Sequence, residues 1–235
     1  MPNGGLLFES CVDSLESAIA SARGGAARVE LCANLDLGGT TPDVELIRRS
    51  VDAIAIPVFV MIRPRGGDFC YDARERRVMV QEIERASNAG AHGIVTGALQ
   101  ADKTIDVETM QCLIEAARPL PVTFHRAVDA TRDIDEALDT VVGLGVARVL
   151  TSGGAATAAE GAAAIADLAA RAGDVLTVIA AGGVRAHNVA ALVQLTRVRE
   201  VHARLINNPP VTLVDDAQMH RWQLTIAEFV TALGG

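Results

Sequence analysis

The chain has 235 residues, of which 50% are hydrophobic, 21% charged and 3% aromatic, and its formal net charge is −8. This composition is typical of a globular protein, and the acidic balance argues against nucleic acid as the main partner. No apolar run reaches the ~18 residues of a membrane span, and residues 1–8 lack the features of a signal peptide. We therefore expect a cytoplasmic protein without a membrane partner.

Short apolar or β-branched runs recur along the chain, and each is followed by an amphipathic stretch. The runs cover residues 6–10, 28–31, 58–62, 93–96, 122–125, 148–151, 176–180 and 200–203. The helical stretches between them cover residues 14–23, 43–51, 73–89, 106–117, 134–144, 158–172 and 186–195. This alternation predicts βαβ units and a parallel sheet.

The helix-capping residues between these stretches agree with that prediction. Glycine precedes several strands, as a left-handed helix C-cap does: Gly25, Gly90 and Gly145. Four residues occupy expected N-cap positions: Asp13, Thr41, Asp106 and Asp133. Eight units of similar length favour a closed (β/α)8 TIM barrel, although the chain is compact for a fold of ~250 residues. A doubly wound open sheet is the alternative.

The C-terminal tail, residues 204–235, departs from the repeating pattern. Residues 207–210, Asn-Asn-Pro-Pro, predict a loop, and residues 216–233 predict a helix that closes the barrel. Nothing indicates a linker or a second domain, so residues 1–235 are expected to form one domain. Association into a homo-oligomer through the outer helices is compatible with this fold, and nothing in the sequence selects one.

Two neighbouring strands end in the same pattern, Glu-x-Cys. These segments are Glu9-Ser10-Cys11 and Glu30-Leu31-Cys32. Side chains alternate along a strand, so inward-facing pairs on strands ~4.8 Å apart would bring two thiols and two carboxylates together. Two thiolates suit a soft ion such as Cu(I) or Zn(II). The alternative is that both cysteines pack as small buried hydrophobic residues.

A second group of polar residues follows the third and fifth strands. Arg63 and Arg65 lie in a rigid turn rich in glycine, where arginines can hold a carboxylate or phosphate. The alternative is that they pair with Glu9 and Glu30. His125, after the fifth strand, is the best candidate for a general acid or base, although it could also be hydrogen-bonded into the rim of the barrel.

Turns after the sixth and seventh strands could present backbone N–H groups to an anion. Their residues are Ser152, Gly153, Gly154, Gly182 and Gly183. With Arg63, Arg65 and Arg126 as an anion clamp and His125, Glu9 or Glu30 as acid/base groups, they outline an enzyme for a small anionic or phosphorylated metabolite. The single lysine, Lys103, lies in a polar loop, which argues against Schiff-base chemistry. No organic cofactor is indicated, and whether the chain is an enzyme stays open at this point.

The motifs at the strand ends together resemble the CutC family of copper homeostasis proteins. The most specific match is Met-Ile-Arg-Pro-Arg-Gly-Gly-Asp-Phe at residues 61–69, followed by Pro-Val-Thr-Phe-His-Arg-Ala at residues 121–127. The resemblance covers about residues 6–203. It implies a TIM barrel, a cytoplasmic location and a role in copper handling, with Cys11 and Cys32 among the Cu(I) ligands. The family pattern His-x-Ser-Ala at the end of the eighth strand is replaced here by His-Ala-Arg-Leu at residues 202–205.

Overall fold

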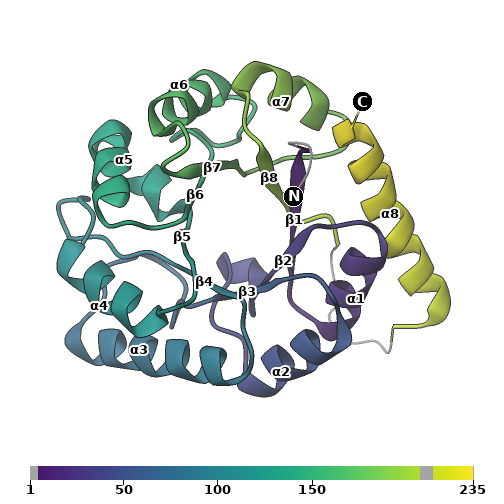
Figure 1. Cartoon of the computed structure of the whole chain (residues 1–235), viewed down its shortest axis with the longest axis horizontal. Coiled ribbons are helices and arrows are strands. Elements are labelled where there is room, and N and C mark those ends of the chain that lie inside the picture. Colours follow the sequence, from purple (N-terminus) through teal and green to yellow (C-terminus); the bar gives the residue numbers. More distant parts are fainter. Residues whose placement is uncertain (1–4, 207–213, 235) are drawn as a thin grey trace.

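Eight short strands run parallel and pair in chain order, and the last strand pairs with the first to close a barrel (Figure 1). The strands are β1 (Leu7–Val12), β2 (Arg28–Leu31), β3 (Val58–Met61), β4 (Gly93–Thr96), β5 (Val122–Phe124), β6 (Arg148–Thr151), β7 (Thr177–Ala180) and β8 (Glu200–Ala203). This computed structural model describes residues 5–206 and 214–234, so the loop expected at residues 207–210 lies outside the described residues. The predicted TIM barrel is confirmed, and closure of the sheet excludes the doubly wound alternative.

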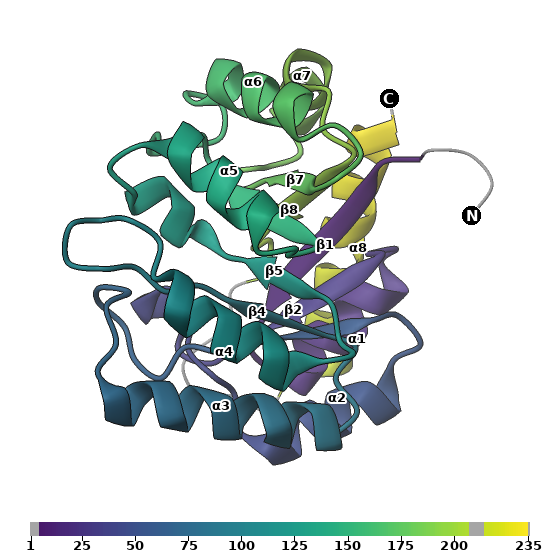
Figure 2. The ribbon, with the colours of Figure 1, turned by 60° about the vertical axis from the view of Figure 1, so that its left-hand side comes forward.

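Helices follow the strands and form a ring around the barrel (Figures 1 and 2). They are α1 (Leu15–Arg23), α2 (Val44–Ala53), α3 (Ala73–Asn88), α4 (Val107–Ala117), α5 (Ile134–Gly143), α6 (Ala162–Ala172), α7 (Val189–Thr196) and α8 (Asp216–Gly234). Two short 3-10 helices, η1 (Leu35–Leu37) and η2 (Arg126–Ala130), follow β2 and β5. The clearest difference from the sequence prediction is that α6 and α7 begin three to four residues later, after turns that follow β6 and β7.

Two helix N-caps differ from the sequence prediction. Ser14, not Asp13, caps α1, and Asp43, not Thr41, caps α2, each with its side chain accepting a backbone N–H in the first turn. The hydroxyl of Thr41 instead accepts from the backbone N–H of Arg63 at 2.9 Å, so it links two loops. Other cap predictions are confirmed: Asp106 and Asp133 as N-caps, and positive φ angles at Gly25, Gly90 and Gly145.

Alternation along the strands divides the buried residues into two sets. One face of each strand packs against the helices in the main hydrophobic core; Phe8 of β1, for example, lies 4.5 Å from Phe229 of α8, measured between ring centroids. The other face points into the barrel. Among the described residues, two small clusters of apolar side chains lie on this inner face. One contains Cys11, Cys32, Phe59, Met61 and Val95, and the other contains Leu150, Ile179 and Ala181. The rest of the interior is left to polar and charged side chains.

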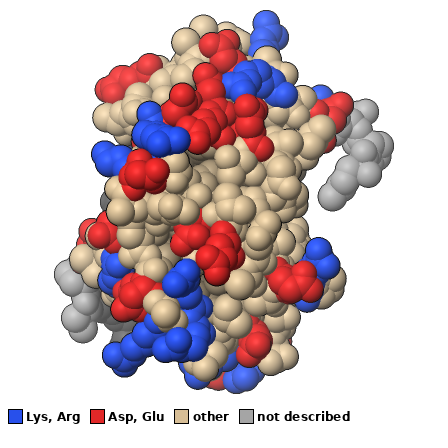
Figure 3. All heavy atoms as spheres, turned by 90° about the vertical axis from the view of Figure 1, so that its left-hand side faces the viewer, with Lys and Arg blue, Asp and Glu red and all other residues tan. Residues whose placement is uncertain are grey.

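The outer surface carries both charge signs. On the face shown in Figure 3, acidic and basic side chains are interspersed around uncharged areas. Arg171 and Asp139, for example, form an ion pair at 2.9 Å, and exposed pairs of this kind contribute little to stability. Across residues 5–206 and 214–234, no helix has both the length and the apolar character needed to cross a membrane.

Candidate functional site

A buried network of charged side chains from β1, β2 and β8 fills part of the barrel interior. The strand register places Glu9 opposite Arg28 on one side and opposite His202 on the other. Nε of Arg28 donates to Oε2 of Glu9 at 2.5 Å, and its NH2 group donates to Glu200 at 2.5 Å. Nδ1 of His202 lies 2.8 Å from Oε1 of Glu9. Both oxygens of the buried Glu9 carboxylate are therefore bound by groups from the neighbouring strands.

Two arginines contact one aromatic ring beside this network. The guanidinium carbons of Arg28 and Arg148 lie 4.9 and 5.1 Å from the ring centroid of Phe59, and such contacts favour a cation. Nε of Arg148 lies 3.5 Å from Oε2 of Glu200. Burial and the nearby charge of Arg28 lower the pKa of Arg148. Two carboxylates, Glu9 and Glu200, thus balance two arginines in this part of the interior.

The network also sets the protonation of Glu9 and His202. Burial by itself would raise the pKa of Glu9, but Arg28 and His202 outweigh burial and hold this pKa at about 2. Burial likewise opposes a charged His202, yet the surrounding Glu30, Cys11 and Glu9 raise its pKa well above 6.5. At neutral pH Glu9 is therefore a carboxylate next to an imidazolium.

Cys11 and Cys32 lie further along the same strands, toward the carboxyl-terminal end of the barrel. Cys11 pairs with Glu30 in the β1–β2 register, and Cys32 follows directly after β2. One ligand atom from each of Cys11, Glu30 and Cys32 lies within 4.8 Å of the other two. The thiol of Cys32 donates to Oε2 of Glu30 at 3.5 Å. The inward-facing arrangement expected from the two Glu-x-Cys segments is present.

The two thiols differ in pKa. The adjacent Cys32 lowers the pKa of Cys11 to about 5 against the effect of burial, with further help from His202 and Glu30. The adjacent Cys11, together with burial and Glu30, raises the pKa of Cys32 well above 9.0. Burial, reinforced by Cys11 and Glu9, raises the pKa of Glu30 well above 4.5 despite the nearby His202. Of the two thiols, Cys11 is therefore the one that loses its proton more readily, and a thiolate is the form of cysteine that binds metal.

A cavity of about 520 Å³ opens at the carboxyl-terminal end of the strands and reaches the thiol pair. Of the residues predicted from the sequence, six line it: Cys11, Glu30, Cys32, Arg63, His125 and Arg126. The others lie outside its lining: Glu9, Arg65, Ser152, Gly153, Gly154, Gly182 and Gly183. The structure thus brings together the thiols and part of the predicted anion site, in one cavity.

His125 follows β5 and is buried at the wall of this cavity. The backbone N–H of Ala127 donates to Nδ1 at 3.2 Å, so the proton of the neutral ring is on Nε2. Gly97 allows the ring to approach, because a Cβ at that position would lie 2.6 Å from Nδ1. Burial and the charge of Arg63 lower the pKa of His125 to about 3. A general acid or base works best with a pKa near the working pH, so this histidine is better suited to donate a hydrogen bond.

Arg63 follows β3, and its guanidinium donates hydrogen bonds to backbone carbonyl groups. Its NH1 group donates to the carbonyls of Leu37 and Gly39 at 3.2 and 3.0 Å, and its NH2 group donates to Gly67 at 2.8 Å. These three carbonyls belong to the loops after β2 and β3. Arg63 therefore ties together two loops that line the cavity.

One of the two alternatives for the arginine turn is wrong. Neither Arg63 nor Arg65 forms an ion pair with Glu9 or Glu30 among the contacts of the described residues. The register explains this result, because Arg28 lies directly opposite Glu9 on the adjacent strand. The Glu9 carboxylate is therefore already bound by a side chain of the barrel interior, and the loop residues Arg63 and Arg65 do not contact it.

The three predicted clamp arginines are not equivalent. Arg65 forms ion pairs with Glu75 at 2.6 Å and with Asp68 at 2.9 Å. Arg126 forms an ion pair with Asp129 at 2.9 Å. Both cations are already paired with carboxylates of this chain. Among the described residues, Arg63 is the predicted clamp arginine without an acidic partner.

The carboxylate of Asp129 occupies the glycine-rich turn after β6. It accepts from the backbone N–H groups of Ser152 and Gly154 at 3.0 and 3.1 Å and from the hydroxyl of Thr151 at 2.6 Å. The N–H group of Gly153 donates to the same threonine hydroxyl at 2.8 Å. An external phosphate in this turn would have to displace a carboxylate that the turn already binds.

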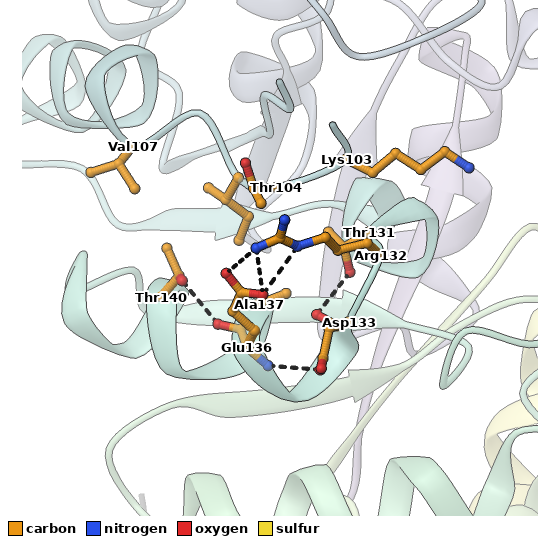
Figure 4. A pocket seen from close by; sticks show the side chains of 10 residues that line it. Lys103, Thr104, Val107, Thr131, Arg132, Asp133, Glu136, Ala137 and Thr140 are labelled. Atoms are coloured by element: carbon orange, nitrogen blue, oxygen red, sulfur yellow. Dashed lines mark hydrogen bonds and ion pairs between the residues drawn. The ribbon is translucent and has the colours of Figure 1, made fainter. Parts of the chain in front are cut away.

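A smaller hollow of about 240 Å³ lies between the loop after β4 and the start of α5 (Figure 4). Within it, Arg132 and Glu136 form an ion pair at 3.0 Å, and Asp133 caps α5. Lys103 is exposed at its edge and its side chain extends away from this pair. The expectation that the single lysine lies outside the barrel interior is confirmed.

Three members of the interior network were not predicted as functional from the sequence: Arg28, Glu200 and His202. The signal that could have found them is the period of two along a strand. Arg28 precedes Glu30 by two residues, and Glu200 precedes His202 by two, so each pair shares one face. Their partners, however, become evident only when β1 lies between β2 and β8.

Known proteins are similar to this chain in sequence and in fold. The model of the CutC family matches residues 6–207. A human protein named copper homeostasis protein cutC homolog is 46% identical over 198 residues, which cover 84% of this chain and 72% of that protein. A family protein CutC of Xanthomonas campestris pv. campestris (strain B100) is 43% identical over 228 residues, covering 97% and 91% of the two chains. The crystal structure of the putative copper homeostasis protein CutC from Streptococcus agalactiae matches with a TM-score of 0.80 at 34% identity, covering 84% of this chain and 97% of that one.

Proposed function

The chain belongs to the CutC family, and on that premise we propose that it acts in copper homeostasis in the cytoplasm by binding Cu(I) through Cys11 and Cys32. Copper is here the cargo of the protein. The observation that carries the proposal is the buried pair of inward-facing thiols, whose sulfur atoms lie within 4.8 Å of each other at the end of a cavity.

The spacing and the chemistry of the pair both suit a soft monovalent ion. Two sulfurs that share a metal at ~2.3 Å are at most about 4.6 Å apart, close to the observed limit. Thiolates select Cu(I) over hard cations. Cys11 is already a thiolate at neutral pH, so binding needs the loss of one proton, from Cys32. The charged His202 next to Cys11 offsets the negative charge of two thiolates around one monovalent ion.

The same pair is poorly placed to form a disulfide. Cys32 lies two residues beyond Glu30, the register partner of Cys11. With strands ~4.8 Å apart and a rise of ~3.3 Å per residue, the Cα atoms are about 8 Å apart. A disulfide without backbone movement needs less than ~7 Å. The geometry therefore supports a shared ion rather than a covalent bond between the two sulfurs.

A Cu(I) competition titration against a chromophoric chelator, under anaerobic reducing conditions, tests the proposal. We expect the wild-type chain to bind one Cu(I) ion and the Cys11→Ser/Cys32→Ser variant to lose this binding. The matched control is Cys70→Ser/Cys112→Ser, which removes the two cysteines outside the cluster. Loss in the first variant and retention in the second would support the thiol site. Stoichiometric binding that survives removal of Cys11 and Cys32 would overturn it, and so would equal loss in both variants.

A further inference from the structure

Arg63 is a buried cation without an acidic partner. It is 5% exposed, and its guanidinium donates to three backbone carbonyls. Nε of Arg63 is buried and has no hydrogen-bond partner, and no carboxylate within residues 5–206 or 214–234 forms an ion pair with this side chain. Buried charges are normally paired, because an unpaired charge away from water is costly.

His125 presents a second unmatched donor. It is 4% exposed, and the bond from Ala127 to Nδ1 leaves the ring proton on Nε2. Nε2 is buried and has no partner among the described residues. A buried N–H group without an acceptor destabilises the folded chain, so an acceptor atom in the cavity would stabilise this arrangement.

The two donors belong to one part of the cavity. Phe69 joins them, because its ring centroid lies 4.8 Å from the guanidinium carbon of Arg63 and 5.0 Å from the ring centroid of His125. All three residues line the cavity that reaches the thiol pair. Burial raises the pKa of the nearby Tyr71 to about 12, so this phenol is neutral and does not balance the charge of Arg63.

We propose that Arg63 and His125 form a carboxylate-binding subsite, and that it holds the carboxylate of a small thiol which brings Cu(I) to Cys11 and Cys32. The identity of this carrier rests on the proposed function, whereas the subsite itself does not. Arg126, the other lining arginine, is balanced by Asp129, so a single positive charge remains to be matched. A monoanionic carboxylate matches one charge and two N–H donors better than a doubly charged phosphate does.

Transfer of the ion in this arrangement is an exchange of sulfur ligands without redox change. The bond between Cu(I) and the carrier sulfur breaks, and bonds from Cu(I) to the sulfurs of Cys11 and Cys32 form. The proton of Cys32 leaves with the carrier sulfur, which departs as a neutral thiol. The carboxylate bound by Arg63 and His125 keeps the carrier in the cavity while the ligands exchange, which raises the effective concentration of the ion at the thiol pair.

Two matched carriers test the proposal on the wild-type chain. Cu(I) is supplied as its complex with 3-mercaptopropionate or with 3-mercaptopropanamide, which has the same shape without the charge. We expect the second-order rate constant of transfer to be at least about tenfold higher for the carboxylate carrier, as one charge-assisted hydrogen bond implies. Equal rates would overturn the carrier subsite while the copper function stands. Failure to take Cu(I) from either carrier would count against the proposed function itself.

Variants show whether the preference arises at these two residues. His125→Asn keeps an acceptor for the N–H group of Ala127 but lacks Nε2, and Arg63→Lys keeps the charge but lacks Nε. We expect both to reduce the ratio between the two carriers toward one, a readout that general destabilisation would not produce. Arg49→Gln, which removes an exposed charge on α2, should leave the ratio unchanged. A preference that persists in both cavity variants would place the carboxylate elsewhere and overturn the assignment.

A copper-free measurement separates the subsite from the thiols. In the Cys11→Ser/Cys32→Ser variant, calorimetric titration with propionate, propionamide and inorganic phosphate compares the three probes directly. We expect binding of propionate only, at least about tenfold tighter than propionamide. Tighter binding of phosphate would show that the ligand of the subsite is a phosphate and would overturn the carboxylate proposal. If none of the three probes binds, the proposal of a subsite is wrong, even if Cu(I) binds to the wild-type chain.

Discussion

At the scale of single residues, chemistry in this barrel depends on the neighbouring strand more than on burial. Cys11 and Cys32 are both buried, yet the pKa of Cys11 falls to about 5 while that of Cys32 rises, because the two adjacent thiols favour a single thiolate. Glu9 and Glu30 differ in the same way: Glu9 has Arg28 as its partner, and Glu30 has none of comparable strength. Specific contacts, rather than depth, therefore decide which groups carry charge.

His125 makes the stability of the folded chain depend on pH. Its pKa is about 3 in the folded chain, against 6.5 for a free histidine, because burial and Arg63 disfavour the imidazolium. Between these values the unfolded chain binds more protons, so stability falls as the pH falls from 6.5 toward 3. We expect His125→Asn to flatten this part of the profile, with a total difference on the order of 5 kcal/mol over the whole window.

Urea unfolding of both chains, at neutral pH and at several values down to about pH 4, measures the slope. His187→Asn, at an exposed position, controls for the substitution itself. Parallel profiles for the wild type and His125→Asn would show that His125 takes up a proton in the folded state, contrary to its buried, neutral assignment.

At the scale of elements, the loops after the strands are held in place by the backbone as much as by side chains. Arg63 bonds to carbonyls in the loops after β2 and β3, and Asp129 bonds to N–H groups in the turn after β6. The start of α6 depends on a close approach, since a Cβ on Gly161 would lie 1.9 Å from the carbonyl oxygen of Ser152. Such contacts fix the shape of the cavity rim.

Two glycine substitutions should change stability in opposite directions. Gly161→Ala places a methyl group against backbone, which cannot move aside cheaply, so we expect a loss of about 2 kcal/mol or more in the free energy of unfolding. Gly143→Ala, at the end of α5, meets no atom within 4 Å and should stabilise the chain by about 0.5 kcal/mol through helix propensity.

Denaturant midpoints of the two alanine variants and the wild type check this pair of expectations. A neutral Gly161→Ala would mean that the chain around α6 shifts without cost, and a destabilised Gly143→Ala would mean that α5 ends differently from the structure described.

At the scale of the whole molecule, closure makes the two ends of the chain depend on each other. β8 pairs with β1, and α8 packs against α1, where a Cβ on Gly24 would lie 2.5 Å from Ile226. Phe8 of β1 contacts Phe229 of α8 across the outer face of the barrel. The first and last segments therefore form one continuous part of the hydrophobic core.

This closure predicts a single cooperative unfolding transition. The only tryptophan, Trp222, is buried on α8, so its fluorescence reports on the tail, while far-UV circular dichroism reports on all helices and strands. We expect the two urea transitions to coincide, as for one domain. A fluorescence transition at lower urea would show that α8 unfolds separately and would contradict the single-domain prediction.

Much of the architecture was determined by the sequence itself. The strand prediction for residues 28–31, 93–96, 148–151 and 200–203 agrees with the structure residue for residue, because buried parallel strands read as short apolar runs with glycine and helix signals between them. The alternation in Glu-x-Cys also placed two thiols on one face, since side-chain direction along a strand is a local property. Helix caps were less reliable, as Ser14 and Asp43 show, because a cap depends on backbone angles at a single residue.

Tertiary structure alone decided which charges meet. Glu9 and His202 are 193 positions apart in the chain and become neighbours only when the barrel closes. The pairing of β1 with β2 makes Arg28, rather than Arg63, the ion-pair partner of Glu9, and Arg63 lies buried among backbone carbonyls. Local sequence sets the direction of each side chain, but ion pairing requires distances between strands, and those distances exist only in the folded barrel.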